Sequence, residues 1–103
     1  MNATLLVRRR AHHGEGLFSE VVIWLLPRTL AGSGHMFKYR LALIHEGVCV
    51  LRYDNEAGKG DHRHLGARED AYAFTTMERL LADFDSDVRR YVDEHAHHRQ
   101  SDR

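Results

Sequence analysis

Residues 37–53, FKYRLALIHEGVCVLRY, form the stretch of sequence that decides the expected fold. Two runs of strand-forming residues, 37–44 and 48–53, flank the turn residues Glu46 and Gly47. Leucine, isoleucine, valine and tyrosine favour extended backbone, and a short glycine-containing loop between two such runs is typical of an antiparallel hairpin. We therefore predict that these two runs pair as neighbouring strands of a sheet.

A two-residue loop in this hairpin also predicts which side chains share a face of the sheet. His45 then lies opposite Val48, and the pairing continues outward until Tyr39 lies opposite Asp54. Since residues paired across a ladder point to the same side, both faces are apolar near the turn and polar at the open end. The two predicted faces carry Lys38, Arg40, Ala42, Ile44, Cys49, Leu51, Tyr53 and Asn55, and Tyr39, Leu41, Leu43, Val48, Val50, Arg52 and Asp54.

Further strands are expected before this hairpin. Residues 4–10 and 18–26 are rich in strand formers and have two glycines between them. They predict a second antiparallel hairpin, whose loop of five or six residues contains His12 and His13. Residues 30–35 form a polar, glycine-containing connector with no expected secondary structure and with freedom to move.

A helix is expected after the strands. Thr75 is the predicted N-cap and Glu78 follows three residues later, which is the spacing of a capping box. The helix is expected to end at about His95, because residues 96–103 have no apolar periodicity and should fray. The apolar residues that recur at helical spacing are Met77, Leu80, Leu81, Phe84, Val88, Tyr91 and Val92.

Runs of strands followed by a helix predict an α+β fold. We expect an antiparallel sheet of four or more strands with the C-terminal helix packed on one face. Residues 1–95 are assigned to this single domain and residues 96–103 to a frayed, His-rich tail. A chain of 103 residues, 43% hydrophobic and 29% charged, has the size and composition of one globular domain.

Charge and cysteine content limit the classes of function. The 15 basic and 15 acidic residues cancel, so net charge gives no argument for nucleic-acid binding, although a local basic face is still allowed. Cys49 is the single cysteine, which excludes an intrachain disulfide and zinc sites built on two or four cysteines. No apolar run is long enough for a transmembrane helix or a secretory signal, so we expect a cytoplasmic protein that does not enter a membrane.

Residues 54–64, DNEAGKGDHRH, are the expected functional site. The stretch combines two histidines with carboxylates, Lys59 and Arg63, and its two glycines allow the backbone to approach a ligand closely. In an extended segment, alternation places His62 and His64 on one face and Arg63 on the other. The predicted hairpin brings four more polar residues to this end of the sheet, namely Lys38, Arg40, Arg52 and Tyr53.

The two histidines have three interpretations. As acid and base catalysts, His62 and His64 can take a proton from a ribose 2′-hydroxyl and give one to the leaving oxygen, while nearby cations stabilise charge on the phosphate. As metal ligands they need a third group, such as Asp61 or Asp54. As part of a solvated turn they need no ligand. The mixed charge and the glycines favour a functional site, and the candidate cations are Lys59, Arg63, Arg40 and Arg52.

Three segments, 38–43, 47–56 and 58–64, resemble the TumE-like family, a small bacterial family described as toxins of type II toxin–antitoxin modules. The similarity of layout extends from Thr4 to Val88. The resemblance implies a cytoplasmic growth inhibitor that is neutralised by an antitoxin, commonly a helix-turn-helix protein encoded beside it. The residues that match the family pattern are Tyr53, Asp54, Asn55, His62 and His64.

We therefore predict a toxin that acts on RNA as a metal-independent endoribonuclease, with the ribonuclease activity inferred from the residue types. No cofactor is expected, because the sequence has no P-loop and no dinucleotide fingerprint. RNA and an antitoxin are the expected partners, and a homodimer is compatible with the sequence. The catalytic candidates are His62, His64, Lys59, Tyr53 and Asp54, and the substrate-binding candidates are Arg40, Arg52, Arg63, Lys38 and Asn55.

Two other functions stay open at the level of sequence. One is a non-catalytic module that binds a protein or a nucleic acid through the same segment. The other is a metal-dependent nuclease or phosphodiesterase whose ligands are His62, His64 and Asp61. Transfer of a nucleotide to RNA, in place of cleavage, is also open.

Overall fold

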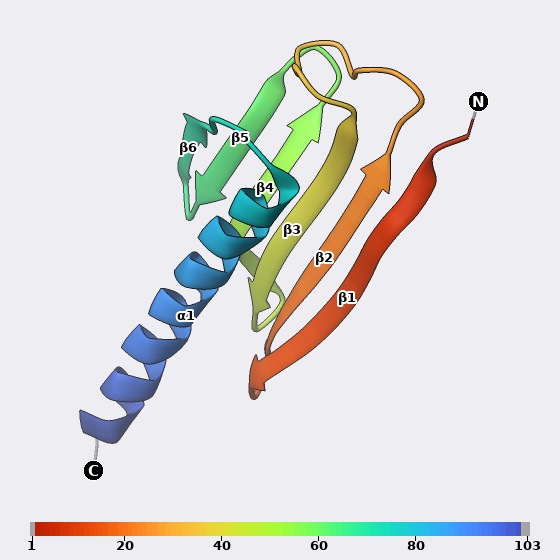
Figure 1. The fold of residues 1–103 in the computed structure, drawn as a ribbon. Helices are drawn as coiled ribbons and strands as arrows, with labels where there is room; N and C mark the ends of the chain where they lie inside the picture. Colours follow the sequence, from red (N-terminus) through yellow and green to blue (C-terminus); the bar gives the residue numbers. More distant parts are fainter. Residues whose placement is uncertain (1, 102–103) are drawn as a thin grey trace. The chain divides into compact units, whose positions relative to one another are not determined.

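The computed structural model describes residues 2–101, and the side chains of residues 2–95. The strands form one antiparallel sheet in which they follow one another in chain order. The predicted α+β fold, with an antiparallel sheet of four or more strands and a C-terminal helix, is confirmed. The elements are β1 (Thr4–Gly14), β2 (Leu17–Leu25), β3 (Phe37–His45), β4 (Val48–Glu56), β5 (Gly60–Leu65), β6 (Arg68–Ala71) and α1 (Met77–Ser101) (Figure 1).

The chain divides between Ala73 and Phe74 into two compact units. The sheet unit contains the six strands, and the helix unit contains α1. The assignment of residues 1–95 to a single domain stays a prediction. No helix within residues 2–101 contains an apolar stretch long enough to cross a membrane.

The turn between β3 and β4 has the predicted chemistry. Glu46 and Gly47 both have positive φ angles, 51° and 79°, which are typical of a type I′ turn and match the twist of antiparallel strands. His45 accordingly pairs with Val48. The predicted pairing next to the turn is confirmed.

A β-bulge in β4 shifts the rest of this register by one residue. Leu43 pairs with Leu51, although Val50 was its predicted partner, and the shift continues to Arg40, which pairs with Asp54. A bulge places an extra residue in one strand, and here Val50 has no opposite residue in β3. The predicted pairs from Leu43 outward are wrong, because the turn sets the register only as far as the first bulge.

The shift changes which side chains share a face of the sheet. Tyr53 and Asn55 do not lie on the face of Arg40 as predicted, whereas Arg52 and Asp54 do. We call the two sides the tyrosine face, after Tyr39 and Tyr53, and the histidine face, after His62 and His64 of β5. In β3 and β4 the tyrosine face carries Tyr39, Leu41, Leu43, Leu51, Tyr53 and Asn55, and the histidine face carries Lys38, Arg40, Ala42, Arg52 and Asp54.

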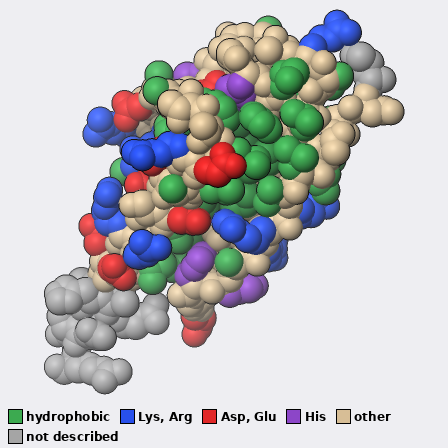
Figure 2. All heavy atoms as spheres, viewed as in Figure 1, with side chains coloured by type: hydrophobic (Ala, Val, Ile, Leu, Met, Phe, Trp, Pro, Cys, Tyr) green, Lys and Arg blue, Asp and Glu red, His purple; other side chains and the backbone are tan. Residues whose placement is uncertain are grey.

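The tyrosine face is the buried side of the sheet. In β2, Leu17, Ser19, Val21 and Ile23 are buried and alternate with half-buried neighbours, as the period of two in a strand requires. Burying one side chain such as Val21 or Ile23 contributes about 1.5–3 kcal/mol to the stability of the fold. Figure 2 shows hydrophobic side chains gathered over the region of β2 and β3, with charged side chains around them.

The first hairpin has a longer strand and a shorter loop than predicted. β1 extends to Gly14, and only Glu15 and Gly16 separate it from β2. Gly16 has a φ of 67°, which glycine adopts at little cost, so two residues suffice for the turn. His12 and His13 therefore lie within β1 and not in a loop.

The cap of α1 lies one residue later than predicted. The Arg79 amide donates to Thr76 Oγ1 at 3.0 Å, so Thr76 is the N-cap and the helix begins at Met77. The capping box predicted for Thr75 and Glu78 is wrong, because the residue three positions after Thr76 is Arg79. The most buried side chains of α1, which recur every four residues, are Leu80, Phe84 and Val88.

The end of α1 lies beyond the predicted one. The helix continues to Ser101, whereas the sequence placed its end at about His95. The predicted frayed tail covers residues 96–103. Its side chains, and all of residues 102 and 103, lie outside the part of the chain that the structure describes.

Candidate functional site

β5 presents two histidines on the histidine face. His62 and His64 alternate with Arg63, and their ring centroids lie 6.4 Å apart. In the ladder between β4 and β5, Asp54 pairs with His62 and Arg52 pairs with His64. The predicted alternation is confirmed, and the register places these four polar side chains on one face.

Three charged side chains surround the Nε2 atom of His64. Arg52 Nη2 lies at 3.1 Å, Glu69 Oε2 at 3.5 Å and Asp54 Oδ1 at 3.7 Å. A guanidinium only donates hydrogen bonds, so Arg52 donates to a lone pair on Nε2 and the ring proton lies on Nδ1. Nδ1 of His64 makes no hydrogen bond or ion pair with another residue within residues 2–95 and is not fully buried.

His62 faces two acceptors. Its Nε2 lies 2.6 Å from the carbonyl oxygen of Lys59, so Nε2 donates this hydrogen bond. Its Nδ1 is buried, has no hydrogen-bond partner among the described residues and lies 3.4 Å from Glu69 Oε2. Only the doubly protonated ring offers a proton to both acceptors.

Two arginines add positive charge to the histidine face. Arg52 Nε lies 2.9 Å from Asp54 Oδ2 in an ion pair, but its N–H is not directed at that oxygen and makes no hydrogen bond. Arg40 is exposed and has no ion pair or hydrogen bond with another described residue. Guanidinium groups bind phosphate through two parallel hydrogen bonds, so Arg40 is available for such a ligand.

The carboxylates beside His64 give this histidine a second possible arrangement. When Arg52 leaves Nε2, that nitrogen can carry the proton and donate it toward Asp54 or Glu69. The lone pair then lies on Nδ1, which is not fully buried. A carboxylate that orients an imidazole in this way is the usual support of a general base.

A second polar cluster is built around Asp61 on the tyrosine face. Its side chain is only 8% exposed and accepts hydrogen bonds from Ser33 Oγ at 2.8 Å and from His35 Nε2 and Tyr39 Oη, both at 2.7 Å. The Phe37 amide donates to His35 Nδ1 at 3.1 Å, so the ring proton of His35 lies on Nε2. Every group in this cluster has a partner, and the cluster fastens the connector between β2 and β3 to β5.

Tyr39 is held as a hydrogen-bond donor. Burial, together with the hydrogen bond to Asp61 and the charge of that carboxylate, raises the pKa of the Tyr39 hydroxyl well above its ordinary value. The hydroxyl therefore stays protonated at neutral pH and contributes a structural hydrogen bond.

The connector is also held by its backbone. The Gly58 amide donates to the Ala31 carbonyl at 2.6 Å. A Cβ atom on Gly32 would lie 2.9 Å from the Gly60 amide nitrogen, so only glycine allows this close approach. The structure thus fixes a segment for which the sequence predicted freedom to move.

Two of the predicted site residues lie in the interior. Asn55 is fully buried, and its side chain accepts from the Tyr39 amide at 3.0 Å and donates to the Phe37 carbonyl at 2.7 Å. Tyr53 is 2% exposed, and its hydroxyl accepts from Arg63 Nε at 3.1 Å. Asn55, Tyr53 and Arg63 are therefore separated from His62 and His64 by the sheet.

The two predicted lysines lie at the margin of the site. Lys38 donates a hydrogen bond to the backbone oxygen of Asn55 at 2.8 Å, so its ammonium group is held at the end of β4. Lys59 lies in the turn before β5, exposed and 3.9 Å from Glu56. Its carbonyl group, rather than its ammonium group, contacts His62.

The predicted metal ligands are not brought together. Asp61 is separated from both histidines because it lies on the tyrosine face, and both of its oxygens already accept hydrogen bonds. Within residues 2–95, no three His, Cys, Asp or Glu side chains form a group that could hold a metal ion.

Three residues of these clusters were absent from the sequence prediction. Glu69 reaches both histidines from β6, a strand that was not among the predicted elements. Ser33 and His35 reach Asp61 from the connector. Gly66, a turn residue directly after the extended segment 60–65, is the signal that could have indicated a further strand.

Comparison with known proteins gives one match. A family described as Toxin TumE matches residues 3–92, which is most of the chain. No curated protein and no solved structure matches this chain. A toxin of a toxin–antitoxin system has an antitoxin as its partner. The match agrees with the resemblance in the hairpin and histidine segments, and the chain belongs to the TumE toxin family.

Proposed function

We propose that this toxin acts on RNA as a metal-independent endoribonuclease whose active site is the histidine face. The observation that carries the proposal is the grouping of His62, His64, Arg52 and Arg40 on one side of the sheet, with Arg40 unpaired among the described residues. Imidazoles transfer protons near neutral pH, and guanidinium groups bind phosphate. Together these groups supply what cleavage by a 2′-hydroxyl requires.

Arg52 acts first in the proposed mechanism. An RNA phosphate competes with His64 for the Arg52 guanidinium, whose Nε has no hydrogen bond to lose. Once Arg52 binds the phosphate, Nε2 of His64 takes the ring proton and donates it toward Asp54 or Glu69. Nδ1 then accepts the proton of the 2′-hydroxyl, which attacks the neighbouring phosphorus.

His62 is the proposed general acid. Its Nε2 proton is held by the Lys59 carbonyl group, in an exposed turn. Passing this proton from the doubly protonated ring to the departing 5′-oxygen leaves a neutral imidazole with its proton on Nδ1 and completes the transfer. Arg40 and Arg52 stabilise the charge on the phosphate. The products of this reaction carry a 2′,3′-cyclic phosphate and a 5′-hydroxyl.

The test uses purified protein and a 5′-labelled RNA of mixed sequence, beside the same RNA with 2′-O-methyl groups, each assayed with and without chelator. We expect cleavage with a 2′,3′-cyclic phosphate end and no cleavage of the 2′-O-methyl RNA. His62→Ala and His64→Ala should each lower the rate by about 10²-fold or more. His12→Ala is the matched control, because His12 is an exposed histidine in β1, at the other edge of the same sheet.

Three results would contradict this proposal. Cleavage that disappears with chelator and returns with one metal ion selects a metal-dependent nuclease. If His62→Ala and His64→Ala both cleave RNA at the wild-type rate, these histidines are not the general acid and the general base. Stoichiometric RNA binding without products, in a preparation that arrests growth, selects a non-catalytic binding module.

A further inference from the structure

β1 is an open edge of the sheet. It is the first strand in the sheet order, so β2 is its single hydrogen-bonded neighbour within the sheet. It has 11 residues, most of them exposed, whereas β6 at the other edge has only 4. An exposed edge strand presents a row of backbone N–H and C=O groups that another chain can pair with.

The charge of β1 opposes pairing with a second copy. Arg8, Arg9 and Arg10 are consecutive in the middle of the strand. Arg10 has an ion pair with Glu20 at 2.6 Å, and Arg8 has no ion pair or hydrogen bond with another described residue. Two antiparallel copies of β1 would bring these triplets together, and like charges directly opposite one another destabilise a strand pair. The edge instead suits an acidic strand.

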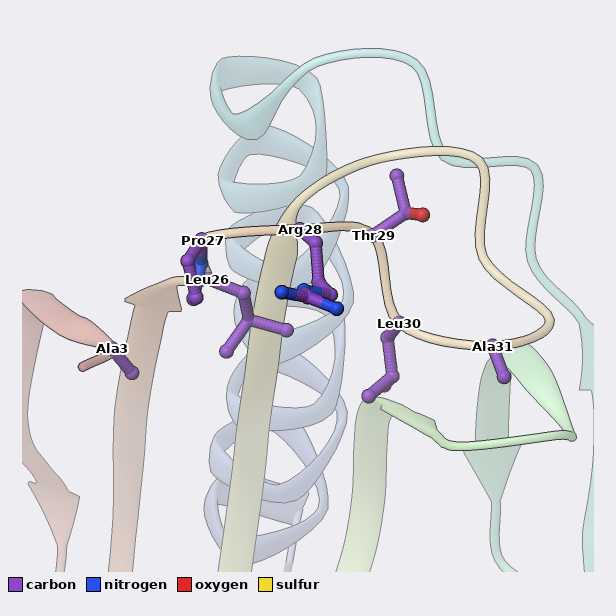
Figure 3. A pocket seen from close by; sticks show the side chains of 7 residues that line it. All are labelled: Ala3, Leu26, Pro27, Arg28, Thr29, Leu30 and Ala31. Atoms are coloured by element: carbon purple, nitrogen blue, oxygen red, sulfur yellow. The ribbon is translucent and has the colours of Figure 1, made fainter. Parts of the chain in front are cut away.

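An apolar surface continues this edge toward the N-terminus. Leu5 and Leu6 are each 42% exposed. Beyond them the segment after β2 forms a hollow of about 360 Å³, which apolar side chains can enter. Its lining residues are Ala3, Leu26, Pro27, Arg28, Thr29, Leu30 and Ala31 (Figure 3).

We propose that β1 is the docking edge for an extended, acidic segment of the antitoxin, which adds to the sheet as a seventh strand. Carboxylates of this segment lie opposite Arg8, Arg9 and Arg10, and one of its apolar side chains enters the hollow beside Ala3. The inference depends on the antitoxin partner of the family and not on RNA cleavage. Backbone hydrogen bonds supply the affinity, and the arginines and the hollow supply the specificity.

Amide hydrogen exchange tests the position of the segment. The full chain is measured alone and in complex with the antitoxin encoded beside it. We expect amides of β1 to exchange more slowly in the complex, while amides of β6 keep their rates. A complex that leaves β1 exchange unchanged overturns the proposal, as does the absence of any complex. This measurement needs no catalytic activity, so its failure is distinct from failure of the ribonuclease proposal.

Charge reversal tests the chemistry of the partner. The variant Arg8→Glu, Arg9→Glu should weaken antitoxin binding by about tenfold or more, since its new carboxylates lie opposite those of the segment. Arg68→Glu on β6 is the matched control at the opposite edge and should bind as wild type. If the charge-reversed variant binds the antitoxin with the affinity of the wild type, the segment is not acidic and the proposal is overturned.

Two other occupants of the edge are distinguishable in the same experiments. Slower β1 exchange that appears with RNA, and not with the antitoxin, assigns the arginine triplet to RNA. A dimer of the chain alone with β1 already protected assigns the edge to a second copy. Either result overturns the proposal.

Discussion

The hydrogen bond from Arg52 to Nε2 of His64 keeps the ring proton on Nδ1, the nitrogen that acts as general base in the proposed mechanism. In the proposed mechanism, the contact of 3.1 Å between Arg52 Nη2 and His64 Nε2 is released when a phosphate attracts the guanidinium. Arg40 makes no comparable contact with a histidine, because it has no partner among the described residues. The two arginines should therefore differ in their effect on cleavage.

We expect Arg52→Gln to lower the cleavage rate at saturating RNA by about 10²-fold, because it loses charge stabilisation in the transition state. Arg40→Gln should mainly raise KM and reduce the dependence of binding on salt. Single-turnover cleavage with increasing RNA separates the two effects. If both variants change KM alone, Arg52 does not act on the reacting phosphate.

Tyr39 couples stability to alkaline pH. Its pKa is raised in the folded protein, whereas a tyrosine of the unfolded chain releases its proton near pH 10. The folded state thus retains a proton that the unfolded state loses. The stabilisation is fully present below about pH 10 and is lost as pH rises above it, by about 1.4 kcal/mol for each pH unit.

Tyr39→Phe measures this coupling. At pH 8 the variant should be less stable than wild type by about 1–2 kcal/mol, because Asp61 loses one of its donors. The difference should narrow as pH rises above 10, since phenylalanine does not titrate. Urea unfolding at pH 8, 10 and 11 gives the comparison. A difference that stays constant over this range would show that the Tyr39 hydroxyl ionises alike in both states.

The turn between β3 and β4 was predictable from this sequence because its chemistry is local, whereas the turn of the first hairpin was predicted too long. Glu46 and Gly47 identify the β3–β4 hairpin, and alternation along β5 places His62 and His64 on one side. The bulge at Val50 was not predictable, because no residue marks it, and it moved Tyr53 and Asn55 to the other face. Contacts between residues that are distant in sequence were also not predicted, because no local pattern marks them.

The contacts of Glu69 and of the connector depend on strands that are distant in sequence. Glu69 meets the histidines only because β6 pairs with β5. Ser33 and His35 meet Asp61 only because β5 lies beside β4 and the connector folds over their turn. The spacing of these residues along the chain therefore does not predict these contacts.

Asp61 is the acceptor through which the side chains of the connector contact β5. Asp61→Ala removes the acceptor of three hydrogen bonds, so we expect a loss of about 3 kcal/mol in the free energy of unfolding. Amides of residues 30–36 should exchange faster in this variant than in wild type. Asp70→Ala is the control, because Asp70 pairs with Arg68 at the surface and its loss should change stability by less than about 1 kcal/mol. Unchanged exchange in residues 30–36 would mean that the backbone contacts alone hold the connector.

The sheet as a whole separates the proposed site from the proposed docking edge. The histidines lie on β5 and the open edge is β1, with β2, β3 and β4 between them. At about 4.8 Å between neighbouring strands, four steps separate them by roughly 19 Å. A strand added at β1 does not reach His62 or His64. Inhibition then requires a part of the antitoxin that extends across the histidine face toward Arg40 and Arg52.

Binding and inhibition should therefore be separable in the antitoxin. We expect the isolated acidic segment to slow exchange in β1 while RNA cleavage continues at the wild-type rate. The complete antitoxin should do both, and its inhibition should weaken in the Arg8→Glu, Arg9→Glu variant, because the extension is no longer tethered at the edge. Cleavage assays with segment and complete antitoxin at matched occupancy make the comparison, with Arg68→Glu as the control for charge reversal. If the segment alone abolishes cleavage, it acts on the histidine face directly, and the separation of the two tasks across the sheet is wrong.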